Sequence, residues 1–413
     1  MKLTGPGDVH LTYCTNVHPG ETLSDVEHAL GSHVAQVRRD LGVPQFGVGL
    51  RLAARAAEQL EQPDALQRFK DLLDELGLYV FTLNGFPYGT FHNQRVKEQV
   101  YEPDWRSEDR VRYSNRLARL LAQLLPSETT GSISTVPLGF RDNIDTRDEP
   151  LLVSNLLRHV AVLHELREQS GQSLSLALEP EPHCRLETLT EAADFLERGP
   201  FSNAGVQQLV QLTGLSRAQA EQALRRHLGV CLDACHMTVE FEEPASAVSQ
   251  LQARGITISK LQISAGLRCE LTGDAAADGR VLSELGTYAD DVYLHQVVER
   301  RGEELFRYLD LPEAFRAYQS STDRRQREWR IHFHVPVFMN ALGRFSSTRG
   351  DLEQLLTLQR QAPFSTHLEV ETYTWQVLPE AVRPSSLAAA LVSELNWTLS
   401  ELGQTPAAAA RVR

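Results

Sequence analysis

Three acidic side chains stand at the ends of short apolar runs. Glu179 ends LSLALE, Asp233 ends VCLD and Glu371 ends LEVE. Short runs of this kind are typical of buried strands, and the carboxyl ends of parallel strands meet at one edge. Carboxylates that converge there repel one another and resist ionisation. A divalent cation resolves this conflict, because it prefers oxygen and imidazole ligands. The pattern therefore predicts a site for one cation, with Mn, Mg, Zn and Fe as candidates.

Alternation along the strands indicates which side chains face inward. Leu174, Leu176 and Leu178 share one parity, which predicts contact with surrounding helices and leaves Glu179 and Glu181 on the other face. The same alternation turns further polar side chains inward: Asp233, Lys260, Gln262, Glu369 and Glu371. The alternative is an internal network of ion pairs or protonated carboxylates, and Lys260 could neutralise Glu369 in this way.

Histidines supplement the acidic set. His236 lies three residues after Asp233 in CLDACH, a spacing that allows metal ligation or contact with a substrate. His332 and His334 share parity in RIHFHVPVF, and His334 is a candidate ligand. His18, in NVHPGET, follows the first predicted strand.

Eight apolar runs define the elements that must position these residues. Strands are predicted at 13–18, 46–52, 78–84, 131–136, 174–179, 230–233, 259–264 and 368–371. Helical patterns separate them; one has Asp64 as its predicted N-cap and Gly77 after its end. Repeated strand–helix–strand units indicate an α/β fold with parallel strands, either an open sheet or a closed barrel. No GxGxxG or GxxxxGK[ST] follows the first strand. Polar residues at strand ends favour the (β/α)₈ TIM barrel.

Two segments interrupt this repeat. Residues 197–228 predict a helical insertion after the fifth strand, and residues 266–360 a β-containing insertion before the last. We expect a single barrel domain over 1–405 and a flexible tail over 406–413.

Composition narrows the classes of partner. The chain has 413 residues and a formal charge of −13, which disfavours binding to nucleic acid. No apolar run approaches the ~18 residues of a membrane span, and the N-terminus has no secretory h-region. The five scattered cysteines fit a reducing cytoplasm better than a disulfide framework.

The order of these motifs resembles the xylose isomerase-like TIM-barrel superfamily of sugar and sugar-phosphate isomerases and epimerases. The resemblance is carried by ALEPEPH, CLDACH, KLQIS and EVETY. More narrowly, CTNVHPGET, TLNGFPYGTFH, HFHVPVF and LEVETYTW resemble the EboE-type proteins of bacterial metabolite-trafficking gene clusters. One departure is Gln262, which stands where the epimerases usually have a metal-binding histidine; His334 is the candidate substitute.

The resemblance implies a role for each residue. Glu179 and Glu371 would ligate the cation and act as the acid–base pair, with Asp233 as a ligand and Gln262 or His334 completing the site. The cation would polarise a substrate carbonyl while the glutamates move a proton through an enediolate. Six residues would contact the substrate: His236, His18, Asn16, Asn84, Tyr88 and His183.

The implied substrate is a sugar, a sugar phosphate or a cyclitol-like metabolite. Two other functions stay open: a metal-dependent hydrolase of the endonuclease IV branch, and a non-catalytic carrier or scaffold. A homo-oligomer or partner proteins of the same pathway are also possible on this resemblance.

Overall fold

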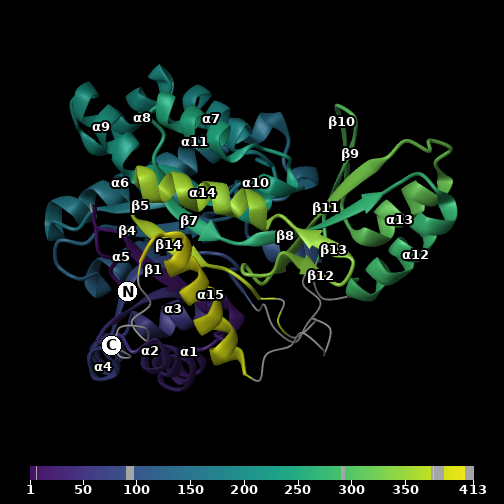
Figure 1. Ribbon diagram of the computed structural model, residues 1–413. Coiled ribbons are helices and arrows are strands. Elements are labelled where there is room, and N and C mark those ends of the chain that lie inside the picture. The colour runs from purple at the N-terminus through teal and green to yellow at the C-terminus, as the bar shows by residue number, and fades with distance from the viewer. Residues whose placement is uncertain (6, 90–96, 290–293, 374, 376–385, 405–413) are drawn as a thin grey trace.

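The chain forms a closed barrel of parallel strands. The computed structural model describes residues 1–5, 7–89, 97–289, 294–373, 375 and 386–404. Its larger sheet has eight strands in the order β1-β14-β7-β6-β5-β4-β3-β2, with parallel pairing throughout. A parallel bridge between Cys14 and Gly49 joins the two outer strands of this order. Because helices separate successive strands, the architecture is the predicted (β/α)₈ barrel (Figure 1).

The barrel strands fall close to the predicted runs. They are β1 (His10–Tyr13), β2 (Phe46–Arg51), β3 (Leu78–Asn84), β4 (Gly131–Thr135), β5 (Leu174–Leu178), β6 (Leu228–Asp233), β7 (Ile258–Ile263) and β14 (His367–Val370). The prediction for the first strand, at 13–18, is wrong, because β1 ends at Tyr13, the residue at which the predicted strand begins. Residues Thr15–Val17 form a short 3₁₀ helix instead, η1. Threonine and asparagine favour such turns, and the preceding HLTY segment is buried throughout.

Helices cover the outside of the barrel. They are α1 (Leu23–Ala29), α2 (Ala35–Leu41), α3 (Ala54–Leu60), α4 (Pro63–Leu76), α5 (Glu108–Leu124), α6 (Glu149–Ser170), α7 (Leu189–Arg198), α8 (Asn203–Thr213), α9 (Arg217–His227), α10 (Ala234–Val239), α11 (Pro244–Ala253), α14 (Arg349–Gln361) and α15 (Leu387–Glu401). A π-helical segment, η2 (Leu30–Val34), joins α1 to α2, and short 3₁₀ helices include η3 (Lys97–Tyr101), η4 (Arg141–Asn143), η5 (Thr146–Asp148) and η6 (Gly286–Tyr288).

The ends of α4 show how local sequence sets a boundary. Gly77 adopts a φ of 64° after the last turn, as its predicted place requires. The predicted N-cap is wrong: the helix starts one residue before Asp64, at Pro63, with Gln62 as N-cap. Proline suits this first position because its missing N–H has no partner within a helix there.

The predicted helical segment between β5 and β6 is present as α8 and α9. Both helices pack against α6 outside the barrel (Figure 1). Their place in the helical layer, away from the carboxyl ends of the strands, gives them a packing role.

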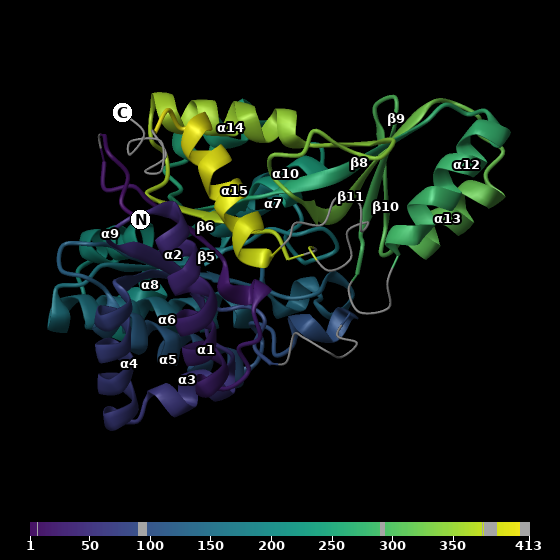
Figure 2. The same ribbon diagram turned by 60° about the horizontal axis from the view of Figure 1, so that its bottom comes forward.

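A second, antiparallel sheet follows β7 directly. Its strands are β8 (Ala265–Leu271), β9 (Val297–Arg301), β10 (Glu304–Tyr308), β11 (Arg327–Val335), β12 (Ala341–Leu342) and β13 (Phe345–Ser347), in the order β10-β9-β11-β8-β13-β12. This sheet extends to one side of the barrel, with α12 (Ala275–Leu285) and α13 (Leu311–Ser320) at its far end (Figures 1 and 2). The predicted insertion over 266–360 therefore reaches too far. Its last residues form α14, which packs against α11 and α15 beside the barrel.

The barrel interior explains a glycine in β2. A Cβ built on Gly49 would lie 1.6 Å from Oε2 of Glu369. The side chain of Glu369 reaches across the barrel from β14 and fills this space, so only glycine fits opposite it.

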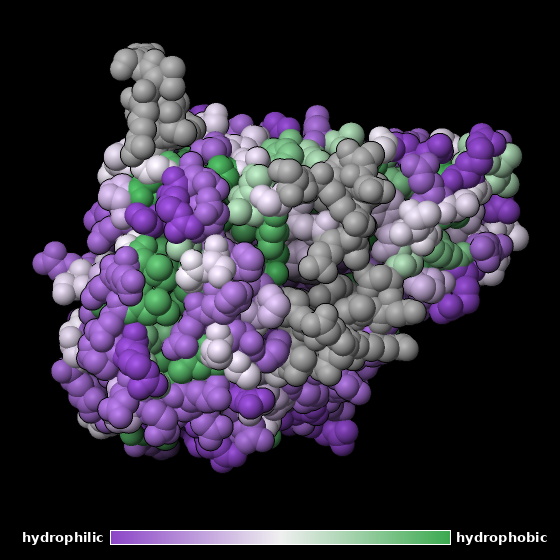
Figure 3. Space-filling model, turned by 90° about the horizontal axis from the view of Figure 1, so that it is seen from below, coloured by the Kyte–Doolittle hydropathy of each residue, from purple (hydrophilic) through white to green (hydrophobic). Residues whose placement is uncertain are grey.

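The surface carries few large apolar side chains. Among the described residues these are Leu151, Leu212 and Leu305, and the face seen from below is mostly hydrophilic with limited hydrophobic areas (Figure 3). No helix in the described ranges combines the length and apolarity that a membrane span needs. All five cysteines are buried and unpaired.

Candidate metal centre at the barrel mouth

A pocket of about 770 Å³ opens at the carboxyl ends of the barrel strands. It brings together six of the residues to which the resemblance gives a role: Asn16, Asn84, Glu179, His236, His334 and Glu371. The second sheet supplies one wall, since β11 carries His332 and His334. Aromatic and apolar side chains, including Phe86 and Val136, complete the lining.

The three predicted carboxylates meet at this mouth. Glu179 follows β5, Asp233 ends β6 and Glu371 follows β14. Asp233 and Glu371 are buried. Burial, followed by the charge of Asp233, raises the pKa of Glu179 to about 8. Burial and the charges of Glu179 and Asp233 raise the pKa of Glu371 well above its ordinary value. The carboxylates therefore act on one another across the pocket, as strand parity predicts.

Hydrogen bonds within the protein do not reach every oxygen of these carboxylates. Oδ1 of Asp233 accepts hydrogen bonds from the backbone N of His236 and from Oγ of Ser264, both at 2.8 Å. Its Oδ2 is buried without a hydrogen-bond partner. Glu371 accepts one hydrogen bond from Nδ2 of Asn16 at 2.6 Å. Within the described ranges, no lysine or arginine forms an ion pair with these three carboxylates. The donor set fits a divalent cation.

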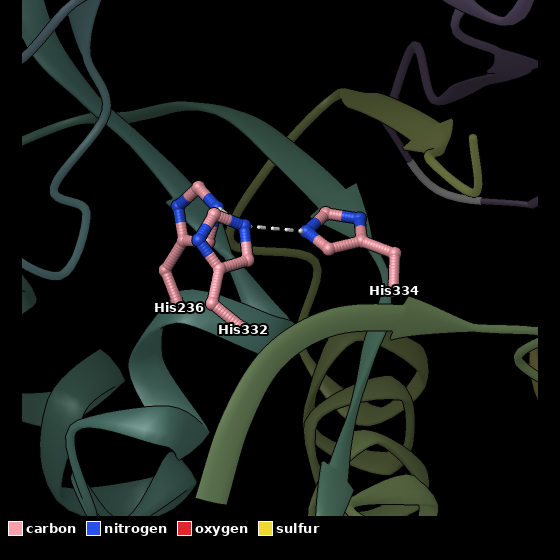
Figure 4. Close-up of side chains that lie close together, drawn as sticks. All are labelled: His236, His332 and His334. Carbon is pink, nitrogen blue, oxygen red and sulfur yellow. Dashed lines mark hydrogen bonds between the residues drawn. The ribbon is translucent and has the colours of Figure 1, made fainter. Parts of the chain in front are cut away.

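Three imidazoles lie beside the carboxylates (Figure 4). His236 comes from α10, and His332 and His334 come from β11. Nε2 of His332 lies 3.1 Å from Nε2 of His236 and 3.2 Å from Nε2 of His334. Burial lowers the pKa of His236 to about 4 and that of His332 well below its ordinary value. These two rings are therefore neutral near pH 7, the form in which histidine binds metals.

One layer below the mouth, the polar side chains neutralise one another. Nζ of Lys260 lies 2.8 Å from Oε1 of Glu369, and both side chains are fully buried. Oδ1 of Asn84 accepts hydrogen bonds from Lys260 at 2.8 Å and from Gln262 at 3.3 Å. The Lys260–Glu369 pair is thus the structural ion pair that the sequence offered as an alternative. Gln262 belongs to this inner layer and does not line the pocket.

Three predicted substrate contacts lie away from the pocket. Nε2 of His18 forms a hydrogen bond with the hydroxyl group of Tyr13 at 2.9 Å, and the imidazole ring stacks on that of His33. Tyr88 packs edge-on against Tyr113. His183 occupies a left-handed backbone position with a φ of 62°. None of the three predicted residues is part of the pocket lining.

The structure adds lining residues that the sequence did not assign. They are Lys97, Tyr101, Glu181, Gln296, His332 and Tyr373. Two of them carried a usable signal, because Glu181 shares the parity of Glu179 and His332 shares that of His334. Tyr101 and Gln296 carried none. Tyr101 comes from η3 and donates a hydrogen bond to Glu181 at 2.7 Å, whereas Gln296 directly precedes β9 of the second sheet.

Solved structures with the same kind of barrel resemble this chain. No protein-family profile and no curated protein sequence matches it. A xylose isomerase-like TIM-barrel protein from Mycobacterium smegmatis in complex with magnesium is 11% identical, with 95% of this chain and 96% of that chain covered and a TM-score of 0.49. An L-ribulose 3-epimerase is 12% identical, with 97% and 96% covered and a TM-score of 0.47. A probable 3-DHS dehydratase from Bacillus anthracis is 13% identical, with 94% and 98% covered and a TM-score of 0.45.

Two of the matching structures are described as xylose isomerase-like or xylose isomerase domain proteins. The assignment of the fold rests on the strand order and closure of the barrel in this chain.

Proposed function

We propose that this chain is a metal-dependent isomerase or epimerase of a sugar, a sugar phosphate or a cyclitol-like metabolite. The observation that carries the proposal is that Glu179 and Glu371 line one pocket, that Asp233 lies beside Glu179, and that no lysine or arginine among the described residues forms an ion pair with any of the three. Such a set is costly for a folded chain unless a ligand compensates it.

Three residues would hold the catalytic cation. Of these, Glu179 and Asp233 offer ligand atoms within 4.8 Å of each other, Glu371 faces the same pocket, and a water or the substrate takes the fourth place. A divalent cation at this position supplies Lewis acidity, which makes the hydrogen beside a substrate carbonyl more acidic.

The chain's own residues would move the proton. One glutamate carboxylate takes the proton from the substrate carbon, and the carboxylic acid of the other returns a proton to carbon. Both glutamates line the pocket in which the substrate would lie. The amide of Asn16 holds Glu371 in place through its hydrogen bond to Oε1.

The lining suits a small polyhydroxylated molecule. The hydroxyl of Tyr101 and the amide of Gln296 provide hydrogen-bonding groups, while Phe86 and Pro87 provide an apolar wall.

Hydrolysis is the second candidate. The cluster of His236, His332 and His334 favours it, because three imidazoles with an open position can hold a cation that activates water. The similarity to EboE-type trafficking proteins, the location in the cytoplasm and association with itself or with partner proteins remain predictions from the sequence.

Exchange of substrate hydrogen with solvent tests the proposal. The manganese-loaded protein is incubated in D₂O with a panel of sugars, cyclitols and their phosphates, and deuterium at carbon is followed by NMR. We expect exchange into at least one compound, and a loss of about 10²- to 10⁴-fold in Glu371→Gln, the usual contribution of one acid–base group. Glu75→Gln, an exposed change on α4, is the matched control.

The outcomes separate the functions. Binding without exchange in the whole panel would indicate a carrier, and oxygen from labelled water in the product would indicate a hydrolase. Either result, or full activity of Glu371→Gln, contradicts the proposal.

A further inference from the structure

We propose that His236, His332 and His334 form a second metal position, separate from the carboxylates and selective for a zinc-class cation. It goes beyond the proposed function, which needs one cation, and it rests on the histidines alone. Figure 4 shows the three rings turned toward a common point from α10 and β11.

The first argument is the hydrogen bonding of each Nδ1. In His236 this atom lies 3.0 Å from the carbonyl oxygen of Pro180, and in His334 it lies 2.8 Å from the carbonyl oxygen of Glu371. A carbonyl oxygen only accepts hydrogen bonds, so each Nδ1 carries a proton. In the neutral ring, Nε2 then presents a lone pair.

His332 is ordered in the same way by a side chain. Its Nδ1 lies 2.9 Å from Oε1 of Gln296. The orientation of that amide is fixed because its Nε2 donates to the carbonyl oxygen of Pro182 at 3.3 Å and to the hydroxyl of Tyr101 at 3.1 Å. The Gln296 oxygen therefore accepts, and Nε2 of His332 also presents a lone pair. Ordering of imidazole ligands by oxygen acceptors on the second nitrogen is usual at metal sites.

The second argument is the spacing of the Nε2 atoms. Lone pairs that face each other at 3.1 and 3.2 Å repel unless a positive charge lies between them. Zinc–nitrogen bonds of about 2.0–2.1 Å at tetrahedral angles place two nitrogens roughly 3.3 Å apart. The two separations therefore match those of a zinc site closely.

The ligand type separates this position from its neighbour. Imidazoles favour zinc and other late first-row divalent ions, whereas carboxylates suit magnesium and manganese. Nε2 of His236 lies 3.9 Å from Oδ1 of Asp233, so the two positions adjoin. All three histidines line the pocket, and the hydroxyl of Tyr373 lies 3.5 Å from Nε2 of His332. Three protein ligands that face a pocket leave the fourth zinc position for water or substrate.

The position also joins two parts of the fold. His236 belongs to the barrel helix α10, and the other two ligands belong to β11 of the second sheet. A cation bound here would tie the second sheet to the barrel mouth.

Counting bound zinc tests the inference. The full chain is stripped with a chelator, loaded with excess zinc and freed of unbound metal, and zinc per chain is measured by mass spectrometry. We expect two equivalents in the wild type, one in His332→Ala and one in Glu179→Gln/Glu371→Gln. His28→Ala, an exposed histidine on α1, is the control and should keep two.

The pattern of losses distinguishes this inference from the proposed function. One zinc that is lost in His332→Ala but kept in the double glutamine variant supports the histidine position and contradicts the catalytic cation. The reverse pattern overturns the histidine position and leaves the proposed function standing. Two zinc ions per chain in His332→Ala would also overturn the histidine position.

A measurement on the unaltered chain covers variants that fail to fold. X-ray absorption at the zinc edge, with one equivalent of zinc, should show about three imidazole nitrogens around the metal. A shell of oxygens with at most one imidazole would contradict the inference.

Discussion

Glu369 and Glu371 stand two residues apart, face the same barrel interior and have opposite surroundings. Oε1 of Glu369 meets Lys260 at 2.8 Å and the amide of Asn84 at 2.8 Å. Oε1 of Glu371 accepts a hydrogen bond from the neutral amide of Asn16, and the charges that act on it are mainly those of the carboxylates Glu179, Asp233 and Glu369, with a smaller opposing effect of Lys260. The barrel neutralises its inner glutamate with protein and leaves the outer one for a ligand.

This difference separates a glutamate that is paired within the protein from the glutamate that we propose as a catalytic group. Sequence and parity treat the two glutamates alike, and burial is similar. The distinction comes from Lys260, which forms an ion pair with the inner glutamate, whereas no lysine or arginine among the described residues forms one with the outer glutamate. A pair of identical substitutions can therefore test it.

Glu369→Gln is expected to have the largest effect on stability. It leaves the buried ammonium of Lys260 without its carboxylate, and removing one partner of a buried ion pair costs about 3–5 kcal/mol. The free energy of unfolding, measured with denaturant on metal-free protein, gives the result. Glu371→Gln is the matched control and should change it by less than about 1 kcal/mol, since it removes a charge that has no cation. Equal losses in both variants would remove the distinction between the layers.

A divalent cation should stabilise the folded chain by binding to the carboxylates at the barrel mouth. Manganese at 100 times its dissociation constant is expected to add about 2.7 kcal/mol to the free energy of unfolding of the wild type. Glu371→Gln should lose most of this gain, because it removes a ligand. Thermal melting with and without the ion measures the effect, and an unshifted wild type contradicts the site.

Gly49→Ala tests the space that Glu369 fills. The new Cβ would lie 1.6 Å from Oε2 of Glu369, and overpacking of this kind costs about 1–3 kcal/mol. Gly31→Ala is the control: nothing lies within 4 Å of its Cβ, and the helical backbone of η2 should gain about 0.5–1 kcal/mol. Denaturant unfolding of both variants provides the comparison, and a neutral Gly49→Ala would show that Glu369 can move aside.

His367, the first residue of β14, is expected to make the stability depend on pH. Burial lowers the pKa of His367 to about 3, against about 6.5 in an unfolded chain. Between these values the unfolded chain binds a proton that the folded chain does not. Stability therefore falls as the pH drops from about 6.5 toward 3, by at most about 1.4 kcal/mol per pH unit for this residue.

His367→Gln should reduce the dependence of the free energy of unfolding on pH by the contribution of one titrating group. Unfolding curves between pH 6.5 and 4.5 measure it. An unchanged slope in His367→Gln would mean that this ring is charged in the folded chain.

The sequence predicted the barrel because its signals are local. Alternation in LSLALE and LEVE fixes both the strands and the inward face, and Glu179 and Glu371 line the pocket at the barrel mouth. The first strand was misplaced because YCTNVH contains β-type residues although its backbone turns after Tyr13. The ends of helices and strands depend on competition between the conformational preferences of neighbouring residues, and sequence patterns describe this competition poorly.

The part of the site that comes from the second sheet was harder to predict from the sequence. The sequence marked His334, but Gln262 was placed beside it as an alternative ligand, whereas Gln262 lies in the inner layer. Parity within one strand fixes the face of a residue and does not fix its depth along the barrel. Depth follows from the stagger between neighbouring strands, which no single run records.

The sequence by itself determined the barrel, its inward-facing acids and the family that they resemble, because residue alternation follows directly from the geometry of a strand. Only the tertiary structure decided which acids are neutralised and which are left for a ligand, and that His332 meets His236 across 96 positions of sequence. Those outcomes depend on distances between elements, which packing alone sets.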